Sequence, residues 1–269
     1  MTRKLSISEV TTRDWTFAED VRYYAAAGIP GIGVWRDKLD AYGLEEGLRL
    51  LAESGLHVAS LVDAGYFLHK TRSQTRRAIE DVLETVELAQ RIKADCLLIV
   101  TGDVGSFFRT VEQAKKLVIA ALQEVMPEAE AKGVRLAIEP INARYPGYTF
   151  LKTIPETLEV IEAVGSPNIG LFFDTDHLYE SPNLFAEIER TGDRIFGVHI
   201  NDMPAQPRPG IDRKLLGEGV IPLKEILSAI EATGYDGYYD VEIMSEDVWA
   251  MDYQRVLEAC KASFARLWQ

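Results

Sequence analysis

Four ionisable residues each stand at the end of a short apolar run in the sequence. They are Glu139 in RLAIEP, Asp174 in GLFFD, His199 in FGVHIND and Glu242 in YYDVEI. Three carboxylates that converged in an apolar setting would repel one another and lose hydration, so a positive group would have to lie among them. Three carboxylate oxygens and one imidazole nitrogen suit a divalent ion. We therefore expect one bound divalent ion, Mn²⁺ in the first place, with Mg²⁺, Co²⁺ and Zn²⁺ as alternatives.

These apolar runs belong to a pattern that the chain repeats. A long amphipathic stretch ends at a glycine or a small polar residue, and a short apolar run follows, as in AEAKGVRLAIEP and IERTGDRIFGVHI. Glycine just past a helix supplies a left-handed C-terminal cap, and short apolar runs are typical of buried parallel strands. With the opening KLSIS, the pattern predicts strands near residues 4–8, 31–35, 57–63, 95–101, 134–139, 168–174, 195–200 and 237–243. Helical patterns cover residues 17–27, 43–54, 73–92, 109–132, 154–164, 222–233 and 252–268.

Eight strand–helix units in a chain of this length predict a single (β/α)8 TIM barrel over residues 1–269. The alternative is a doubly wound open sheet. We favour the barrel because no strand is followed by a glycine-rich phosphate loop and no Pro/Ser-rich linker separates two halves of the chain.

In a barrel, alternate residues of each strand point into the lumen, and chemistry collects at the C-terminal ends of the strands. Bulky residues are expected to face the helices: Leu136, Ile138, Leu171, Phe173, Phe196, Val198, Ile200, Tyr239, Val241 and Ile243. The four ionisable residues then point inward at one level. Arg135 and Asp240 share the inward parity, and we expect each to be paired inside the barrel, because an unpaired buried charge is costly. For Asp240 the expected neighbour is Lys4 or a serine of KLSIS.

Composition limits the partners. The chain of 269 residues is 47% hydrophobic and 26% charged, and its formal net charge of −13 opposes binding to nucleic acid or an anionic membrane. Cys96 and Cys260 make neither a disulfide framework nor a thiol zinc site. No apolar stretch approaches the ~18 residues of a membrane span. We expect a cytoplasmic protein without nucleic-acid or membrane partners. The sequence does not decide whether the protein forms a homo-oligomer.

The sequence resembles the xylose isomerase-like TIM-barrel superfamily, in particular sugar isomerases and epimerases such as inosose isomerase and the ketose 3-epimerases. The resemblance covers essentially the whole chain and is carried by AIEPIN, GLFFDTDH, GVHIND, DRKLLGEG and YYDVEI. It implies that Glu139, Asp174, His199 and Glu242 are the metal ligands. It also implies that His177 and Arg213 contact the substrate.

One position departs from the ketose 3-epimerases. Those enzymes have a further glutamate six residues beyond the first metal ligand, where this chain has Tyr145. The inosose isomerase branch is closer, through DRKLLGEGVIPL and VHINDM. The resemblance therefore implies a small carbohydrate or cyclitol substrate, without choosing between the two.

The expected chemistry is proton transfer next to a carbonyl. A metal chelated by a carbonyl and an adjacent hydroxyl stabilises an enediolate, and a carboxylate removes the α-proton. Glu139 and Glu242 are the expected proton-transfer groups. Return of the proton to the opposite face gives an epimer, and return to the neighbouring carbon gives an isomer; both stay open.

Three other functions were weighed. An inosose or dehydroshikimate dehydratase of the same superfamily is the main alternative, since loss of a β-hydroxyl can follow the same first step. An apurinic-site endonuclease is disfavoured, because that family needs three zinc ions and many histidines and this chain has four histidines. A non-catalytic binding barrel would leave the four ligands unexplained.

Further expectations concern other residues near the strand ends. Trp35 and His69 are candidate substrate contacts, Trp35 as an aromatic wall. Arg36 and Lys38 are read as a solvated loop rather than an acid-binding pair, and His57, at the start of its strand, as structural.

Overall fold

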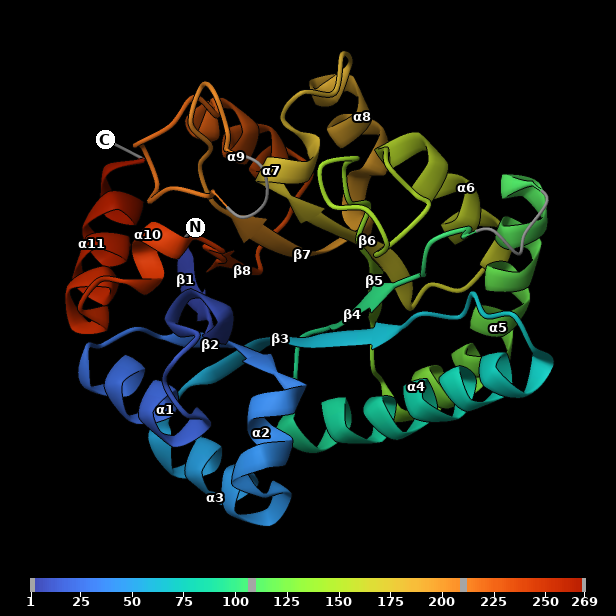
Figure 1. Ribbon diagram of the computed structural model, residues 1–269, viewed down its shortest axis with the longest axis horizontal. Coiled ribbons are helices and arrows are strands. Elements are labelled where there is room, and N and C mark those ends of the chain that lie inside the picture. Colours follow the sequence, from blue (N-terminus) through green and yellow to red (C-terminus); the bar gives the residue numbers. More distant parts are fainter. Residues whose placement is uncertain (1–2, 106–109, 209–211, 268–269) are drawn as a thin grey trace.

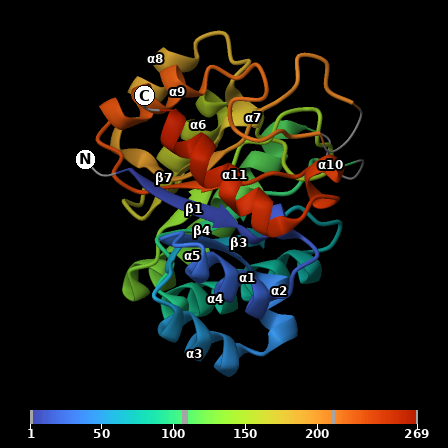
Figure 2. The ribbon, with the colours of Figure 1, turned by 90° about the vertical axis from the view of Figure 1, so that its left-hand side faces the viewer.

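The computed structural model describes residues 3–105, 110–208 and 212–267. Within these residues eight parallel strands close into a barrel in the order β1 to β8, with helices around it (Figure 1). The side view shows α3 and α4 on one side of the strands and α8 and α9 on the other (Figure 2). None of the described helices is long and apolar enough to cross a membrane. The (β/α)8 prediction is confirmed.

The strands lie close to the predicted segments. Their bounds are β1 Lys4–Ser8, β2 Gly31–Trp35, β3 His57–Gly65, β4 Leu97–Val100, β5 Leu136–Ile138, β6 Ile169–Asp174, β7 Ile195–Ile200 and β8 Tyr238–Val241. Three of these, β1, β2 and β7, match the predicted bounds at both ends.

The helices are α1 Phe17–Ala26, α2 Arg36–Tyr42, α3 Leu44–Ser54, α4 Arg72–Ile92, α5 Val111–Lys132, α6 Ile154–Val164, α7 Thr175–Leu178, α8 Leu184–Thr191, α9 Leu223–Ala232, α10 Glu246–Trp249 and α11 Tyr253–Arg266, with 3₁₀ turns η1 Glu9–Thr12 and η2 Gly192–Arg194. Prediction missed α2, α7, α8 and α10, which are too short to show a helical period. The predicted helix ends at residues 109 and 268 lie outside the described residues.

Local sequence explains where the long helices begin and end. Thr16, Thr71 and Thr153 each cap a helix by accepting from the backbone N–H three residues on, and the side chain there bonds back to the cap. Gly55 and Gly133 end α3 and α5 in the left-handed conformation. These helix ends fix the residue at which the chain leaves the helix and turns toward the next strand.

Buried apolar residues form two layers. The outer layer, between strands and helices, includes the predicted outward residues of β5, β6 and β8 together with Val198 and Ile200. The inner layer fills the lumen and consists of Val62, Cys96, Leu98, Val100, Ala137, Ile141, Phe172 and Phe196.

Phe196 was predicted to face outward, and that prediction is wrong. Leu171 pairs with Ile195, but Phe172 pairs with Gly197, so β7 carries one extra residue at this point. Such a bulge shifts the alternation and places Phe196 in the lumen layer. Gly197 is required beside it, since a Cβ there would overlap the Phe172 ring.

The expectation for Arg135 is also wrong. It precedes β5, is exposed, and donates from Nε to the carbonyl oxygen of Asp95 at 2.9 Å. Asp240, in contrast, is buried in the barrel as expected. It pairs in register with Ser6 of β1 and accepts from Ser60 Oγ at 3.4 Å, whereas Lys4 bonds to the carbonyl oxygen of Asp236.

Candidate metal centre and cavity

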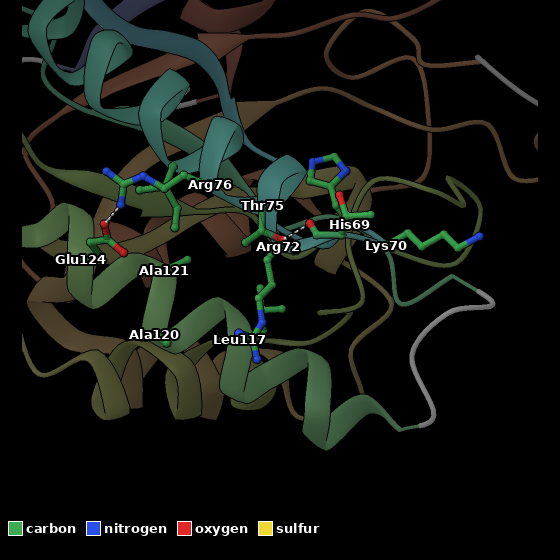
Figure 3. Close-up of a pocket in the computed structure, with 11 residues that line it drawn as sticks. His69, Lys70, Arg72, Thr75, Arg76, Leu117, Ala120, Ala121 and Glu124 are labelled. Carbon is green, nitrogen blue, oxygen red and sulfur yellow. Dashed lines mark hydrogen bonds and ion pairs between the residues drawn. The ribbon is translucent and has the colours of Figure 1, made fainter.

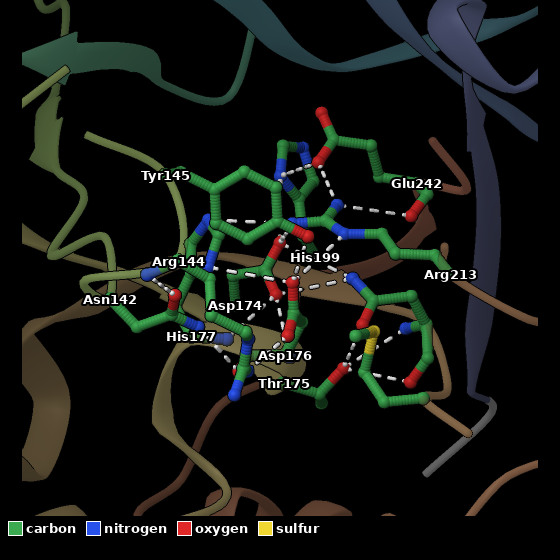
Figure 4. A network of polar contacts seen from close by, with 12 residues as sticks. Asn142, Arg144, Tyr145, Asp174, Thr175, Asp176, His177, His199, Arg213 and Glu242 are labelled. Atoms are coloured by element: carbon green, nitrogen blue, oxygen red, sulfur yellow. Dashed lines mark hydrogen bonds and ion pairs between the residues drawn. The ribbon is translucent and has the colours of Figure 1, made fainter. Parts of the chain in front are cut away.

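The four predicted ligands lie in one layer at the C-terminal ends of their strands. Asp174 and His199 are register partners on β6 and β7. Glu139 and Glu242 follow β5 and β8 directly, and their backbone N–H groups still bond to the neighbouring strands, at Ile99 and Ile200. All four side chains are buried. Strand parity therefore brings these residues together, and Figure 4 shows three of them, Asp174, His199 and Glu242.

His199 faces carboxylates with its Nδ1 atom. Glu242 Oε2 lies 3.3 Å away, Glu139 Oε1 3.6 Å and Asp174 Oδ2 3.8 Å. Among the residues that the structure describes, neither His199 Nδ1 nor Glu139 Oε1 has a hydrogen-bond partner, although both atoms are buried. The ligand atoms of Glu139, Asp174 and His199 lie within 4.8 Å of one another. Unpaired buried donors and acceptors at this spacing fit a divalent ion.

Asp240 contacts His199 on the side of the ring that faces away from the three carboxylates. Its Oδ2 lies 3.5 Å from His199 Nε2, the ring nitrogen that faces away from the three carboxylates. A carboxylate on the far side of a metal-binding imidazole orients the ring and selects its tautomer. Gly33 on β2 leaves the room for this carboxylate, since a Cβ there would overlap Asp240 Oδ2.

Arg213 is a fully buried guanidinium beside the ligands, with 1% of its surface exposed. Its Nε donates to Asp176 Oδ2 at 3.3 Å, and its Nη1 donates to the carbonyl and the carboxylate of Glu242. Its Nη2 lies 3.0 Å from Asp174 Oδ2 and 3.3 Å from His177 Nε2. Each of the three nitrogens of Arg213 therefore contacts at least one polar group of the site.

Charge and burial shift the pKa values of the site. Burial raises the pKa of Asp174, but the Arg213 guanidinium, ahead of His177 and His199, brings that pKa down to about 2. Burial raises the pKa of Glu139, against the opposing effect of His199. Burial lowers the pKa of His199, but Glu242 and Asp240 outweigh it and raise that pKa well above its usual value.

Asp176 organises the rim of the site, and sequence reasoning missed it. Its Oδ2 accepts from the Tyr145 hydroxyl at 2.7 Å as well as from Arg213, and its Oδ1 accepts from Arg144 Nη2 at 2.6 Å. Figure 4 shows Arg144 and Tyr145 reaching this network from one side and Arg213 and Glu242 from the other. The GLFFDTDH motif contained the signal, as a second carboxylate two residues after Asp174.

A cavity of about 80 Å³ opens above the ligand layer. Its lining residues are Trp35, Val62, Asp63, Leu98, Val100, Glu139, Ile141, Tyr145, Tyr148, His177, Arg213, Glu242 and Met244. Trp35, expected as an aromatic wall, lies in this lining and donates from Nε1 to Ser8 Oγ at 3.0 Å. Asp63 and Tyr148 were not predicted as site residues, although Asp63 ends a predicted strand in the same way as Asp174.

His69 is not brought to this cavity. It lines a different one, between α4 and α5, together with Lys70, Arg72 and Arg76 (Figure 3). The chain turns away from the barrel mouth between β3 and α4, which carries His69 past the strand ends. His57 begins β3, at the opposite end of the barrel, and pairs with Asp95 at 2.8 Å.

Comparison with known proteins places these features in a family. The family model described as a xylose isomerase-like TIM barrel matches residues 21–262. An inosose isomerase of Halalkalibacterium halodurans is 28% identical over 55% of this chain, and the match spans about half of that relative's length, 53%. A D-psicose 3-epimerase of Enterocloster bolteae is 25% identical over 84% of this chain and 77% of its own.

Solved structures agree over nearly the whole chain. Protein SMc04130 of Sinorhizobium meliloti 1021 is 33% identical and superimposes with a TM-score of 0.93 over 98% of both chains. The IOLI protein, solved with a bound zinc atom, is 22% identical, with a TM-score of 0.87 over 98% of this chain and 97% of its own. The second likeness shows a common fold.

Proposed function

The chain belongs to the xylose isomerase-like TIM-barrel family, and on this premise we propose that it is a divalent-metal-dependent isomerase or epimerase of a keto-sugar or keto-inositol. One observation carries the proposal. Glu139 and Glu242 line the same cavity, and they follow β5 and β8, two strands that are separated in the barrel by β6 and β7. Two carboxylates that reach a substrate from different sides can remove a proton and return it elsewhere.

We propose Glu139, Asp174, His199 and Glu242 as the residues that hold the ion. The unpartnered atoms His199 Nδ1 and Glu139 Oε1 support this assignment, and so does the zinc atom of the IOLI neighbour. A divalent ion supplies a Lewis acid that polarises a substrate carbonyl and makes the adjacent C–H group acidic. Mn²⁺ is our first expectation, with Mg²⁺, Co²⁺ and Zn²⁺ as alternatives.

The chain's own residues then move the proton. One of Glu139 and Glu242 accepts the α-proton at a carboxylate oxygen, and the other donates a proton to the opposite face or to the neighbouring carbon. Arg213 donates to Glu242 Oε2 and so fixes the direction of that carboxylate. The lumen layer below and Trp35, Tyr145 and His177 around the cavity limit the access of water to the reacting carbon.

The function is tested by proton exchange in D₂O. Mn²⁺-loaded protein is incubated with ketohexoses and keto-inositols, and products are followed by NMR and mass spectrometry. Deuterium at the α-carbon with unchanged composition supports the isomerase or epimerase. Loss of water instead supports the dehydratase alternative. The absence of exchange and of dehydration with every compound contradicts the proposal.

Two variants test the roles of the carboxylates. Glu139→Gln and Glu242→Gln should abolish exchange even when excess Mn²⁺ restores metal occupancy, because an amide cannot accept the α-proton. Glu84→Gln, on the exposed side of α4, is the matched control and should keep the native rate. Exchange at the native rate in metal-loaded Glu139→Gln would remove Glu139 from the mechanism.

A further inference from the structure

Four cations that follow the barrel strands or line the cavity, Arg36, Lys38, Arg144 and Arg213, are each bound to protein oxygens. Arg213 contacts groups of the site with all three of its nitrogens, as described above. Arg36 bonds to Asp81 and Thr85 through Nη1, at 2.9 and 2.7 Å. Lys38 bonds to Asp20 at 2.7 Å and to two backbone carbonyls.

Arg144, the fourth of these cations, binds Glu180 and Asp176 through its two Nη atoms, while its Nε has no hydrogen-bond partner among the described residues. Arg144 does not line the cavity. Among the described residues, Arg213 is therefore the one Lys or Arg in the cavity wall. No guanidinium or ammonium in this wall is left to receive an anionic group of a substrate.

Asp63 adds a further carboxylate to the wall of this cavity. On β3, Leu61 pairs with Leu97 and Ala64 pairs with Ile99, so two residues, Val62 and Asp63, stand opposite one residue of β4. This bulge turns both side chains toward the lumen, and both line the cavity. In the described part of the chain no Lys, Arg or His forms an ion pair with Asp63.

Tyr66 holds this carboxylate in place. Its hydroxyl donates to Asp63 Oδ2. Its backbone has a φ of 49°, in the left-handed region that a bulky side chain rarely adopts, and its N–H donates to the Val100 carbonyl at 2.6 Å. An ionised carboxylate offers about four acceptor sites, and Tyr66 occupies one of them. Acceptor capacity remains toward the cavity.

We propose that Asp63, positioned by Tyr66, determines specificity by accepting a hydrogen bond from a substrate hydroxyl and by excluding substrates that carry a carboxylate or phosphate. The inference rests on the proposed function and names its substrate class, a neutral polyhydroxylated ketone. A carboxylate or phosphate bound on the Asp63 side of the cavity would meet that carboxylate without a guanidinium or ammonium beside it, because the proposed ion and Arg213 are held by Glu139, Asp174 and Glu242. Like-charge repulsion at Asp63 disfavours an anionic group there relative to a hydroxyl. Burial raises the pKa of Asp63, and the nearby charges of Asp37 and Glu242 add to that rise.

Matched pairs of compounds test the selectivity. The matched pairs are D-psicose with its 6-phosphate and D-fructose with its 6-phosphate. Neutral 2-keto-myo-inositol and anionic 3-dehydroshikimate are added as cyclic ketones that differ in more than charge. Dissociation constants are measured by calorimetry with Mn²⁺-loaded wild-type protein, and exchange is measured in D₂O. We expect at least one neutral compound to bind about tenfold or more tightly than its anionic partner. Equal or tighter binding of the anionic members, or no binding by any probe, overturns the inference.

Variants then assign the selectivity to Asp63. Asp63→Asn should weaken binding of the neutral probe about tenfold and narrow its preference over the anionic partner, because a charge-assisted hydrogen bond is lost. Tyr66→Phe should raise KM several-fold with a smaller change in kcat, as expected for a positioning residue. Asp193→Asn, exposed at the opposite end of the barrel, is the control and should change neither value. Equal behaviour of Asp63→Asn and Asp193→Asn contradicts the inference.

The two proposals fail in different ways. Exchange with phosphorylated ketoses as fast as with neutral ones keeps the proposed function and overturns the role of Asp63. Selective binding of neutral probes that depends on Asp63, without exchange or dehydration, keeps the role of Asp63 and overturns the function. Melting temperature and Mn²⁺ stoichiometry show whether each variant is folded, and should Asp63→Asn not fold, the wild-type selectivity and Tyr66→Phe decide.

Discussion

Replacing Arg213 with methionine is expected to destabilise the metal-free protein strongly. The guanidinium is buried and contacts three buried carboxylates, those of Asp174, Asp176 and Glu242. Removing one partner of a buried ion pair costs about 3–5 kcal/mol, because the remaining charge stays desolvated. Asp174 gives an independent scale, since its pKa of about 2 lies below the ordinary 3.8. That difference corresponds to roughly 2–3 kcal/mol of net stabilisation of this carboxylate, to which His177, His199 and Asn201 contribute alongside Arg213.

The same substitution should tighten the binding of a divalent ion. Arg213 occupies Asp174 Oδ2 and Glu242 Oε2, the oxygens that we propose as metal ligands, so guanidinium and ion compete for them. Without the competing charge, we expect the Mn²⁺ dissociation constant to fall about tenfold, or ~1.4 kcal/mol. Saturating Mn²⁺ should therefore return more stability to Arg213→Met than to the wild type.

Urea unfolding at neutral pH, with and without Mn²⁺, and calorimetric titration of the metal measure both effects. Neutral pH is chosen because the folded pKa of Asp174 is depressed. The stability that this carboxylate contributes is therefore complete above about pH 4 and is lost as pH falls toward 2. Arg76→Met is the control, because Arg76 is 54% exposed and pairs with Glu80 and Glu124 on the surface, where about 0–1 kcal/mol is expected. A loss no larger than the control's, or weaker Mn²⁺ binding in Arg213→Met, would refute the competition.

The barrel and the lumen-facing position of the four candidate ligands were predictable because they depend on regular periods. Helices that end at glycine return the chain to the next strand, and consecutive strands of the barrel are neighbours, so the order of strands follows from the sequence. Once the order is known, a period of two residues places Glu139, Asp174 and His199 on the lumen side. The apolar residues that alternate with the lumen-facing ones, such as Leu171 and Phe173 on β6, indicated which face of the strand points outward.

What could not be predicted lies where that period breaks. The bulge in β7 turns Phe196 inward, and the bulge in β3 brings Asp63 into the cavity. Both depend on the register with a neighbouring strand, which leaves no local mark in the sequence. Arg135 precedes its strand by one residue, and strand ends are less sharply encoded than strand centres. The choice of partners for Arg213 is likewise set by packing in three dimensions.

Three further predictions concern the metal, the lumen and an ionic cluster near β1. Chelation should remove one divalent ion per chain and lower the melting temperature, and Asp174→Asn should weaken the ion's binding at least tenfold (~1.4 kcal/mol); native affinity in that variant contradicts the ligand assignment. Gly197→Ala should cost about 1–3 kcal/mol in urea unfolding, because its Cβ would overlap the Phe172 ring in a closed lumen, and an unchanged unfolding free energy contradicts this packing. The last prediction follows from Asp20, whose pKa burial raises to about 6 against the opposing charge of Lys38. Since that folded pKa exceeds the ordinary 3.8, the folded state binds the extra proton between the two values, and the stability that the proton contributes is present below about pH 4 and is lost as pH rises through about 6. Wild-type stability relative to Asp20→Asn should accordingly fall by about 3 kcal/mol between about pH 4 and pH 7, and a difference that does not change with pH would show that Asp20 titrates as it does in the unfolded chain.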